Sequence, residues 1–330
     1  MRVYPEQFAA ATYLDHALRV HDFLARQSDL SPHNPWVSTT LTAFVRDTMR
    51  PRSAAQVTAI LAAPALQEIA PDLRRLLGRA EYEMECYCAH AMTGAIKNAE
   101  SRFSSYTNFI YRDNYAALIA NELRLMKRHG KMPPLRPDRE SIAVVGAGPL
   151  PISAIMYHQG TGFPVTCIDS DARACALGRN LVRHLAATVP RLAGIDRKIH
   201  YLHKTGEEHD YVTHPIVSIA SLVTNKAPVI MRIIKTSHTV ATTIVRSTEG
   251  LGTLLYKPEN STGGQESYNI YLTGQTRPTP QTINTSLVYR FPAGKFRIRN
   301  KIEWEALPDD LQHIRPRPYR LWRTRPQDHL

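Results

Sequence analysis

A short apolar run that leads into a glycine turn constrains the fold of this chain more than any other segment. Residues 141–145 read Ser-Ile-Ala-Val-Val, and the turn that follows is Gly146-Ala147-Gly148-Pro149-Leu150. A β-branched run, a glycine turn, a helix and an acid about 20 residues later form the first unit of many nucleotide-binding α/β proteins. Here the acid is Asp169, at the end of the next apolar run. The pattern predicts a mostly parallel sheet with a ligand site at its carboxyl edge.

The same turn limits the kind of ligand. Gly146 and Gly148 allow the backbone to approach a ligand without a Cβ in the way, and Asp169 can accept hydrogen bonds from ribose hydroxyls. The third glycine of dinucleotide-binding turns is missing, and Pro149 stiffens the loop where a pyrophosphate would be held. We therefore predict an adenosyl ligand without phosphates, chiefly S-adenosylmethionine, with Ser221 near the end of a later predicted strand as a further contact. A glycine turn in an α/β protein without any nucleotide is the alternative.

Length and composition narrow the class of protein. The chain has 330 residues, of which 43% are hydrophobic, which is enough for two ordinary cores. No apolar run approaches the roughly 20 residues of a membrane span, and the first residues lack the apolar region of a signal peptide. These features predict a cytoplasmic globular protein with no membrane partner, and the predicted adenosyl site implies a small-molecule substrate. Its oligomeric state is left open.

Charge and cysteine usage add two further expectations. Much of the formal net charge of +12 lies in a basic run near the C-terminus, so we expect a solvated charged extension and no nucleic-acid partner. The four cysteines have neither the spacing nor the companion histidines of a zinc site. We expect them to be reduced and packed, and we expect no metal.

Hydrophobic periodicity divides the chain into four parts. Apolar residues recur at helical spacing in residues 8–24, 41–49 and 71–96. Pro71 is expected in the first turn of the third of these helices. After a Pro-rich segment, strand-like runs alternate with helical ones. The predicted parts are a helical domain, a linker, an α/β ligand-binding domain and a basic extension, at residues 1–130, 131–137, 138–294 and 295–330. The strands expected to be parallel are residues 141–145, 165–168, 199–202, 215–222 and 242–246. A terminal antiparallel pair is expected at residues 268–272 and 287–291.

One acid interrupts the apolar face of the third helical segment. Glu81 follows Leu77 by four residues and precedes Met84 by three, where the pattern requires a hydrophobic residue. Glu85 borders the same face, whereas Glu83 points away. A carboxylate that faces an interior must be paired, protonated or used on a ligand. Glu81 is therefore either half of a buried ion pair with a nearby arginine or a catalytic residue.

Two tyrosines precede the predicted helix at residues 116–128. If that helix already includes them, Tyr111 and Tyr115 are neighbours at i, i+4, and Glu122 continues the line from Tyr115. Polar aromatic rings near an acid can hold a cationic ligand. Ordinary packing of tyrosines is the alternative.

Taken together, several segments resemble the nicotianamine synthase family, a branch of the class I S-adenosylmethionine-dependent fold with a helical N-terminal domain. They occur in the family's order, over roughly residues 30–291. The matching segments are Gly78-Arg79-Ala80-Glu81-Tyr82-Glu83-Met84-Glu85, Phe109-Ile110-Tyr111-Arg112-Asp113-Asn114-Tyr115 with Glu122, Val145-Gly146-Ala147-Gly148-Pro149-Leu150-Pro151, Ile168-Asp169-Ser170-Asp171, and Val245-Arg246-Ser247 before Leu254-Leu255-Tyr256.

The resemblance implies transfer of a 3-amino-3-carboxypropyl group instead of a methyl group. In that chemistry an amine attacks Cγ of the methionine moiety and methylthioadenosine leaves. The products of the family include nicotianamine, opine metallophores and, in a related branch, azetidine-2-carboxylic acid. The residues suit this reaction, because Tyr111 or Tyr115 can hydrogen-bond the attacking amine and Glu81 can accept its proton.

Two departures from the family pattern favour intramolecular cyclisation to azetidine-2-carboxylic acid. Arg112 stands where many members have a second tyrosine, and about 35 residues from Lys295 follow the usual end of the family and could cover the site. Transfer to an external amino acid or to a second S-adenosylmethionine is the alternative. An S-adenosylmethionine-dependent methyltransferase is a second alternative, and a non-catalytic binding protein is a third.

Overall fold

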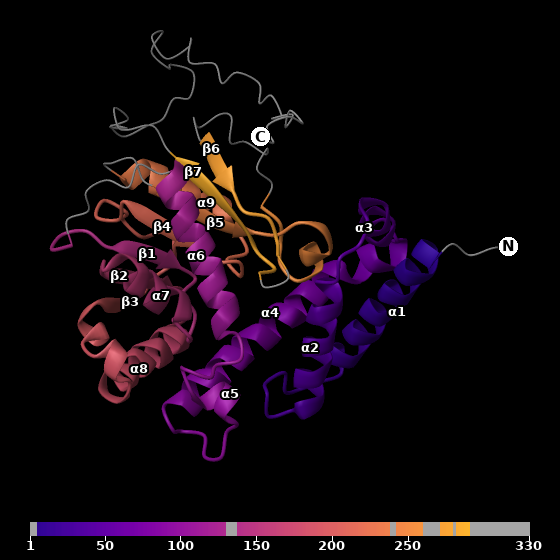
Figure 1. Ribbon diagram of the computed structural model, residues 1–330, viewed down its shortest axis with the longest axis horizontal. Helices are drawn as coiled ribbons and strands as arrows, with labels where there is room; N and C mark the ends of the chain where they lie inside the picture. Colours follow the sequence, from indigo (N-terminus) through magenta and orange to yellow (C-terminus); the bar gives the residue numbers. More distant parts are fainter. Residues whose placement is uncertain (1–4, 130–136, 238–241, 260–270, 280–281, 291–330) are drawn as a thin grey trace, which may run out of the picture.

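The computed structural model describes residues 5–129, 137–237, 242–259, 271–279 and 282–290. A group of helices forms one end of the molecule, and a twisted sheet with helices on its faces forms the other (Figure 1). The predicted basic extension lies outside the described residues, as does the predicted linker apart from Pro137. The helices before the sheet are α1 (Pro5–Ala25), α2 (Pro35–Thr48), α3 (Ala54–Leu61), α4 (Pro64–Met92), α5 (Ser101–Ser104) and α6 (Arg112–His129).

Local sequence signals start several of these helices. The Asn34 side chain accepts hydrogen bonds from the backbone N–H groups of Trp36 and Val37, which caps α2 before its first-turn proline. Ser53 and Gln56 form a reciprocal capping box at the start of α3, a helix that the sequence interpretation did not include. The prediction for Pro71 was wrong, since α4 begins at Pro64 and Pro71 lies inside the helix.

Helix α4 joins the two ends of the molecule. Its first half packs Leu73, Leu77 and Ala80 into a core shared with α1 and α2, whereas its last turns pack Cys88 and Met92 against the sheet side. Residues 251–255, which follow the fifth strand, contribute three leucines to the helical core. The helical end is therefore held on the sheet by a continuous helix and by a returning segment.

The sheet has seven strands in the order β3-β2-β1-β4-β5-β7-β6. Strands β1 to β5 pair in parallel, and β7 runs antiparallel between β5 and β6. The predicted parallel strands and the terminal antiparallel pair are confirmed, with bounds that differ by a few residues. The strands are β1 (Ile142–Val145), β2 (Val165–Asp169), β3 (Ile199–His203), β4 (Ile216–Ile219), β5 (Thr242–Ser247), β6 (Tyr271–Gln275) and β7 (Thr285–Arg290).

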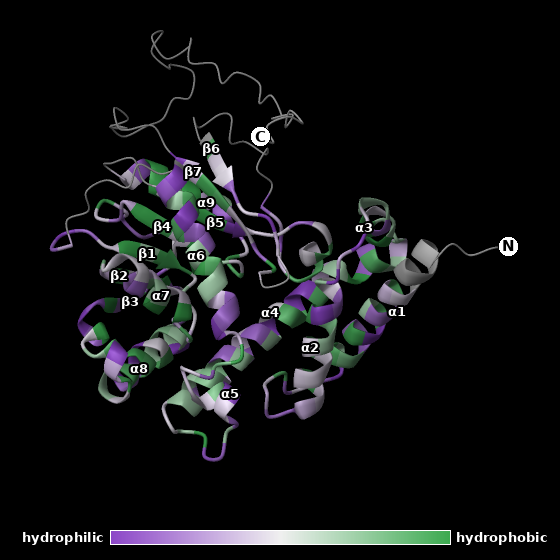
Figure 2. Cartoon of the chain, in the orientation of Figure 1, coloured by the Kyte–Doolittle hydropathy of each residue, from purple (hydrophilic) through white to green (hydrophobic). Residues whose placement is uncertain are grey.

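Alternate residues of the strands face two different cores. Val144 belongs to the core on the side of α6, α7 (Ile152–Thr161) and α8 (Ala172–Thr188), whereas Val145 belongs to the core on the side of α9 (Lys226–Thr236). Both faces of the sheet are therefore covered, as its apolar strands require. Figure 2 shows the middle of the sheet, around β1, β4 and β5, as mostly hydrophobic, whereas β6 is pale and the helices carry both hydrophilic and hydrophobic residues.

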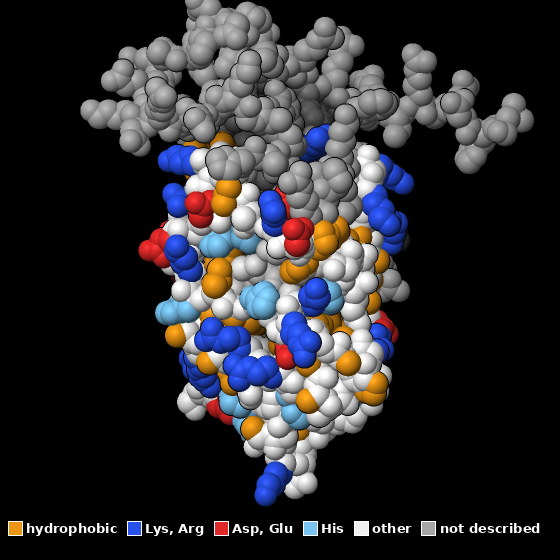
Figure 3. Space-filling model, turned by 90° about the vertical axis from the view of Figure 1, so that its left-hand side faces the viewer, with side chains coloured by type: hydrophobic (Ala, Val, Ile, Leu, Met, Phe, Trp, Pro, Cys, Tyr) orange, Lys and Arg blue, Asp and Glu red, His pale blue; other side chains and the backbone are white. Residues whose placement is uncertain are grey.

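The outer surface over α8 is basic. Figure 3 shows Lys and Arg side chains gathered there, with hydrophobic side chains scattered between them. All four cysteines are buried and free, as the sequence predicts. Within the described residues, no helix is long and apolar enough to cross a membrane.

Candidate active site between the sheet and the helical domain

A cavity of about 1100 Å³ opens where the carboxyl ends of the central strands face α4 and α6. The strand order reverses between β1 and β4, and ligands of open α/β sheets bind at such a switch point. Loops after β1, β2 and β4 form one wall of the cavity, and helices form the other. The cavity therefore brings together residues predicted on the glycine turn and residues predicted on the helical segments.

The glycine turn forms the centre of the sheet wall and needs its glycines for two reasons. Gly146 and Gly148 have φ angles of 72° and 66°, in the left-handed region that favours glycine. A Cβ on Gly146 would lie 2.5 Å from Val223 Cγ2, and a Cβ on Gly148 would lie 2.6 Å from Glu85 Oε2. The turn therefore approaches both the loop after β4 and a carboxyl group of α4.

Asp169 ends β2 directly beside this turn. Its carboxylate accepts hydrogen bonds from the backbone N–H groups of Gly148 at 2.8 Å and Asp171 at 2.9 Å. The Tyr201 hydroxyl donates to the Gly148 carbonyl at 2.9 Å. Asp169 therefore fixes the shape of the turn and also lines the cavity, and its carboxylate has acceptor capacity beyond these two hydrogen bonds.

The helical wall carries two acids one turn apart on α4. Glu81 is half-buried and is hydrogen-bonded to Tyr256. Burial raises the pKa of Glu81 to about 7, although the hydrogen bond from Tyr256 and the charge of Arg246 lower it. Glu85 is 9% exposed and accepts a hydrogen bond from the Tyr115 hydroxyl at 3.3 Å. Burial, and then the nearby charge of Glu81, raises the pKa of Glu85 well above its ordinary value.

The two predicted tyrosines lie on the same wall, at the start of α6. Tyr115 N–H donates to the Tyr111 carbonyl at 3.0 Å, so the chain already turns helically between them. Burial raises the pKa of both hydroxyls, and the charges of Glu85 and Glu81 raise that of Tyr115 further. Both tyrosines are thus neutral near pH 7 and able to donate hydrogen bonds.

A fully buried ion pair lies at the base of the cavity. Arg246, at the end of β5, donates to the two carboxylate oxygens of Glu122 on α6 at 3.0 and 3.1 Å. Ser286 and Tyr157 also donate to this carboxylate, and Ser153 accepts from Arg246. Glu122 is 0% exposed, so its charge is compensated within the protein.

Nine of the ten predicted site residues line the cavity, and Pro149 is the one that does not. Arg112, which the sequence analysis considered as a departure from the family pattern, is also outside the lining. Ser221 lines it with its hydroxyl accepting a hydrogen bond from Asn284 at 2.6 Å. The predicted residues in the lining are Glu81, Tyr111, Tyr115, Gly146, Ala147, Gly148, Leu150, Asp169 and Ser221.

The sequence interpretation missed two groups of this site. Glu85 was placed only at the border of the apolar face, although the i, i+4 spacing from Glu81 could have identified it as a partner. Tyr256 follows the five-residue η3 turn (Gly250–Leu254) and reaches Glu81 only because that segment packs back onto the helical core. No local pattern in the sequence predicts that this segment packs against the helical core.

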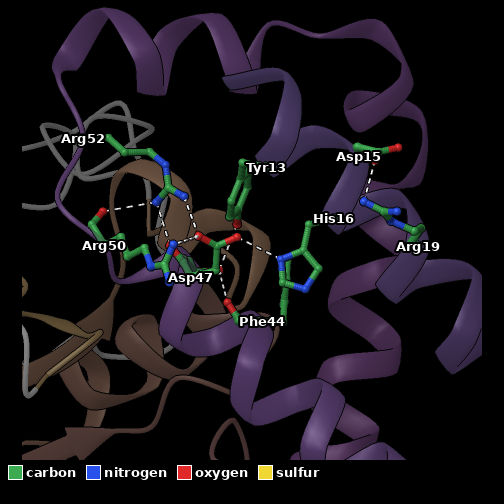
Figure 4. A network of polar contacts seen from close by, with 9 residues as sticks. Tyr13, Asp15, His16, Arg19, Phe44, Asp47, Arg50 and Arg52 are labelled. Atoms are coloured by element: carbon green, nitrogen blue, oxygen red, sulfur yellow. Dashed lines mark hydrogen bonds and ion pairs between the residues drawn. The ribbon is translucent and has the colours of Figure 1, made fainter. Parts of the chain in front are cut away.

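The cavity extends beyond the acids toward the end of α2. Leu41, Thr42, Val45 and Arg46 line this outer part. The end of α2 is fixed by a polar network in which Asp47 binds Arg52 and His16, both at 2.8 Å (Figure 4). These contacts hold the end of α2 beside the outer part of the cavity.

The strand order, the glycine turn after β1 and the acid at the end of β2 define the class of fold. The chain has the α/β fold of class I S-adenosylmethionine-dependent methyltransferases, preceded by a helical domain, as the sequence predicts. It matches the family described as nicotianamine synthase protein over residues 5–293, and it belongs to that family.

Two solved structures have a fold similar to that of this chain. A variant of MtNAS in complex with S-adenosylmethionine has a TM-score of 0.66 and 18% identity, covering 88% of this chain and all of that one. MtNAS in complex with MTA and tNA has a TM-score of 0.67 and 18% identity, covering 88% of this chain and 99% of that one. No curated protein sequence gave a match. Among the described residues, no group of three or more His, Cys, Asp or Glu side chains is placed to hold a metal ion.

Proposed function

We propose that this protein transfers the 3-amino-3-carboxypropyl group of S-adenosylmethionine to an amine. The amine nitrogen forms a bond to Cγ of the methionine moiety, the Cγ–S bond breaks, and its electron pair leaves with methylthioadenosine. The proton lost by the amine passes to a base. The observation that carries the proposal is the pair Glu81 and Glu85, which faces the glycine turn across one cavity together with Tyr115 and Tyr256.

The sheet wall suits the adenosyl part of this donor. Gly146 and Gly148 let the backbone approach the ligand, and Asp169 has acceptor capacity left for ribose hydroxyls. The MtNAS structure with S-adenosylmethionine supports this choice of donor within the same family. The acids around the turn suit a donor that carries positive charge.

Glu81 suits the role of the base. Because burial raises its pKa to about 7, it is partly ionised at neutral pH and is a stronger base than an ordinary carboxylate. Tyr256 orients this carboxyl by a hydrogen bond, and Tyr111 and Tyr115 offer hydroxyls to the amine on the same wall. The sulfonium is already a good leaving group, so orientation and exclusion of water are the main tasks of the site.

The size of the cavity favours an external amine as acceptor. Its volume of about 1100 Å³ exceeds the roughly 300–1,000 Å³ of most small-molecule sites. The outer part beside α2 offers space for a second molecule next to the donor. Cyclisation to azetidine-2-carboxylic acid, which the sequence analysis favours, stays a prediction, because the extension on which it depends lies outside the described residues.

Chromatography of the products distinguishes these reactions. The purified full chain is incubated with S-adenosylmethionine alone and then with each of the 20 standard amino acids. Methylthioadenosine that appears only with an added amino acid supports transfer to an external acceptor, whereas methylthioadenosine with azetidine-2-carboxylic acid in the first incubation supports cyclisation. S-adenosylhomocysteine as the co-product would rule out the proposal in favour of methyl transfer.

A further inference from the structure

Glu85 is a buried acid whose charge the protein does not balance. The side chain is 9% exposed, and its only hydrogen bond within the described residues is the one from Tyr115 to Oε1. No described lysine, arginine or histidine forms an ion pair with it. A buried carboxyl in this state is either protonated or takes its counter-charge from a ligand.

The unpartnered oxygen of Glu85 faces the glycine turn. Oε2 lies 2.6 Å from the position that a Cβ on Gly148 would occupy, so the carboxyl touches the turn at the point where a side chain is missing. Glu85 also lines the cavity. Its free oxygen is therefore placed at the site of the proposed donor and not at the outer part beside α2.

The charges around Glu85 are mostly of its own sign. Glu81 lies one turn away on α4, Asp169 lies across the turn, and both raise the pKa of Glu85. Arg246 acts in the opposite direction, but its guanidinium is already bound to Glu122. The inner part of the cavity thus attracts a cation.

We propose that Glu85 binds the α-ammonium group of the methionine moiety of the donor. This inference rests on the proposed function. An ammonium group has three N–H donors that fit a free carboxylate oxygen, whereas a sulfonium has none. The ammonium charge also persists throughout the reaction, while the sulfonium charge disappears as the Cγ–S bond breaks. A carboxylate fixed beside the sulfonium would favour the ground state over the transition state and slow the reaction.

Binding of three related ligands tests this assignment. S-adenosylmethionine has both charges, S-adenosylhomocysteine keeps the ammonium without the sulfonium charge, and methylthioadenosine has neither. Titration calorimetry on the full chain is compared for the wild type and Glu85→Gln. We expect the variant to bind the first two ligands about 10-fold to 100-fold more weakly, as for loss of a charged hydrogen bond, and to bind methylthioadenosine almost unchanged.

Control variants separate a binding role from a structural one. Glu83→Gln removes an acid from the same helix, but Glu83 binds Arg79 and the Leu30 backbone outside the cavity, so it should leave all three affinities unchanged. Glu85→Asp keeps the charge and should restore part of the affinity for S-adenosylmethionine. In turnover assays, Glu85→Gln should raise KM for the donor with a much smaller change in kcat.

Other results would overturn the inference. Weaker binding of S-adenosylmethionine alone would assign Glu85 to the sulfonium, and equal weakening of all three ligands would assign it a structural role. Failure of the wild type to bind any of the three would overturn both this inference and the proposed function. Methyl transfer by the wild type would reject the proposed reaction, yet the three affinities would still decide the role of Glu85.

Discussion

Two pairs of ionisable side chains lie near the cavity, Glu122 with Arg246 and Glu81 with Glu85, and they differ in whether a partner of opposite charge is present. Glu122 and Arg246 are buried together, and every oxygen of the carboxylate accepts a hydrogen bond. Glu81 and Glu85 are one turn apart on α4 and have no cation paired with either of them within the described residues. Burial alone is therefore not what separates a structural acid from a chemical one.

The difference is whether the protein itself supplies the compensating charge. Glu122 is paired within the protein at the junction of α6 with β5, so removing either partner would leave a buried charge uncompensated. Glu81 and Glu85 repel each other, and burial raises the pKa of both. This leaves them ready to accept a proton or a cationic ligand, which is the property expected of an active site.

The largest expected effect is loss of turnover in Glu81→Gln. The substitution keeps the shape of the side chain but removes the base, so kcat should fall about 100-fold to 10,000-fold while donor affinity stays near that of the wild type. Rates of methylthioadenosine release and calorimetric titration with S-adenosylmethionine measure the two quantities. Glu83→Gln is the matched control, and unchanged turnover in Glu81→Gln would remove this acid from the mechanism.

For Glu122→Gln we expect the main effect on stability instead of on turnover. This change leaves Arg246 buried without its counter-charge, which typically costs about 3–5 kcal/mol of unfolding free energy. Urea denaturation followed by circular dichroism measures the loss, and Glu81→Gln should lose far less by the same measurement. Equal losses in the two variants would contradict the distinction between the pairs.

An intermediate effect is expected for Asp169→Ala. The aspartate holds the Gly148 N–H and faces the proposed ribose position, so its loss should weaken binding of S-adenosylmethionine about 10-fold to 100-fold. Its effect on kcat at saturating donor should be smaller than that of Glu81→Gln. A fall in kcat with unchanged donor affinity would instead place Asp169 with the acids of α4.

Most of the sheet wall could be predicted from the sequence because its signals are local. The apolar run, the glycine turn and Asp169 are read within about 30 residues of chain, and each of them requires a particular backbone geometry. The alternation of strands and helices then predicts parallel pairing, whereas the order of the strands comes from the structure. The bounds of β4 were less accurate, since residues 220–222 are apolar enough to extend a strand but form the cavity loop.

The helical wall could be predicted only in part because its contacts are distant in the chain. The position of Glu81 on an apolar face left two interpretations open, an ion pair with a nearby arginine or a catalytic role, and no arginine of the described residues forms an ion pair with it. Tyr256 is 175 positions from Glu81, and their contact depends on how residues 251–255 pack into the helical core. Tertiary packing of this kind leaves no periodic pattern in the sequence.

The smallest effect, and the most direct test of how Glu81 is tuned, is a shift of the pH profile in Tyr256→Phe. The Tyr256 hydroxyl lowers the pKa of Glu81 by hydrogen-bonding it, so its removal should raise that pKa above the value of about 7. A base must be unprotonated to act, so the acidic limb of log kcat/KM should move to higher pH. A neutral hydrogen bond corresponds to a shift of about 0.4–1 pH unit.

The same profile also reports on the charge of the donor. The acidic limb of the pH profile of kcat reports the pKa of Glu81 in the complex with the donor. The positive charge of the bound donor favours ionised Glu81, so this limb should lie at lower pH than the acidic limb of kcat/KM. Tyr256→Phe should raise both limbs, while Glu83→Gln should move neither. A limb of kcat/KM that stays in place in Tyr256→Phe would mean that a group other than Glu81 accepts the proton.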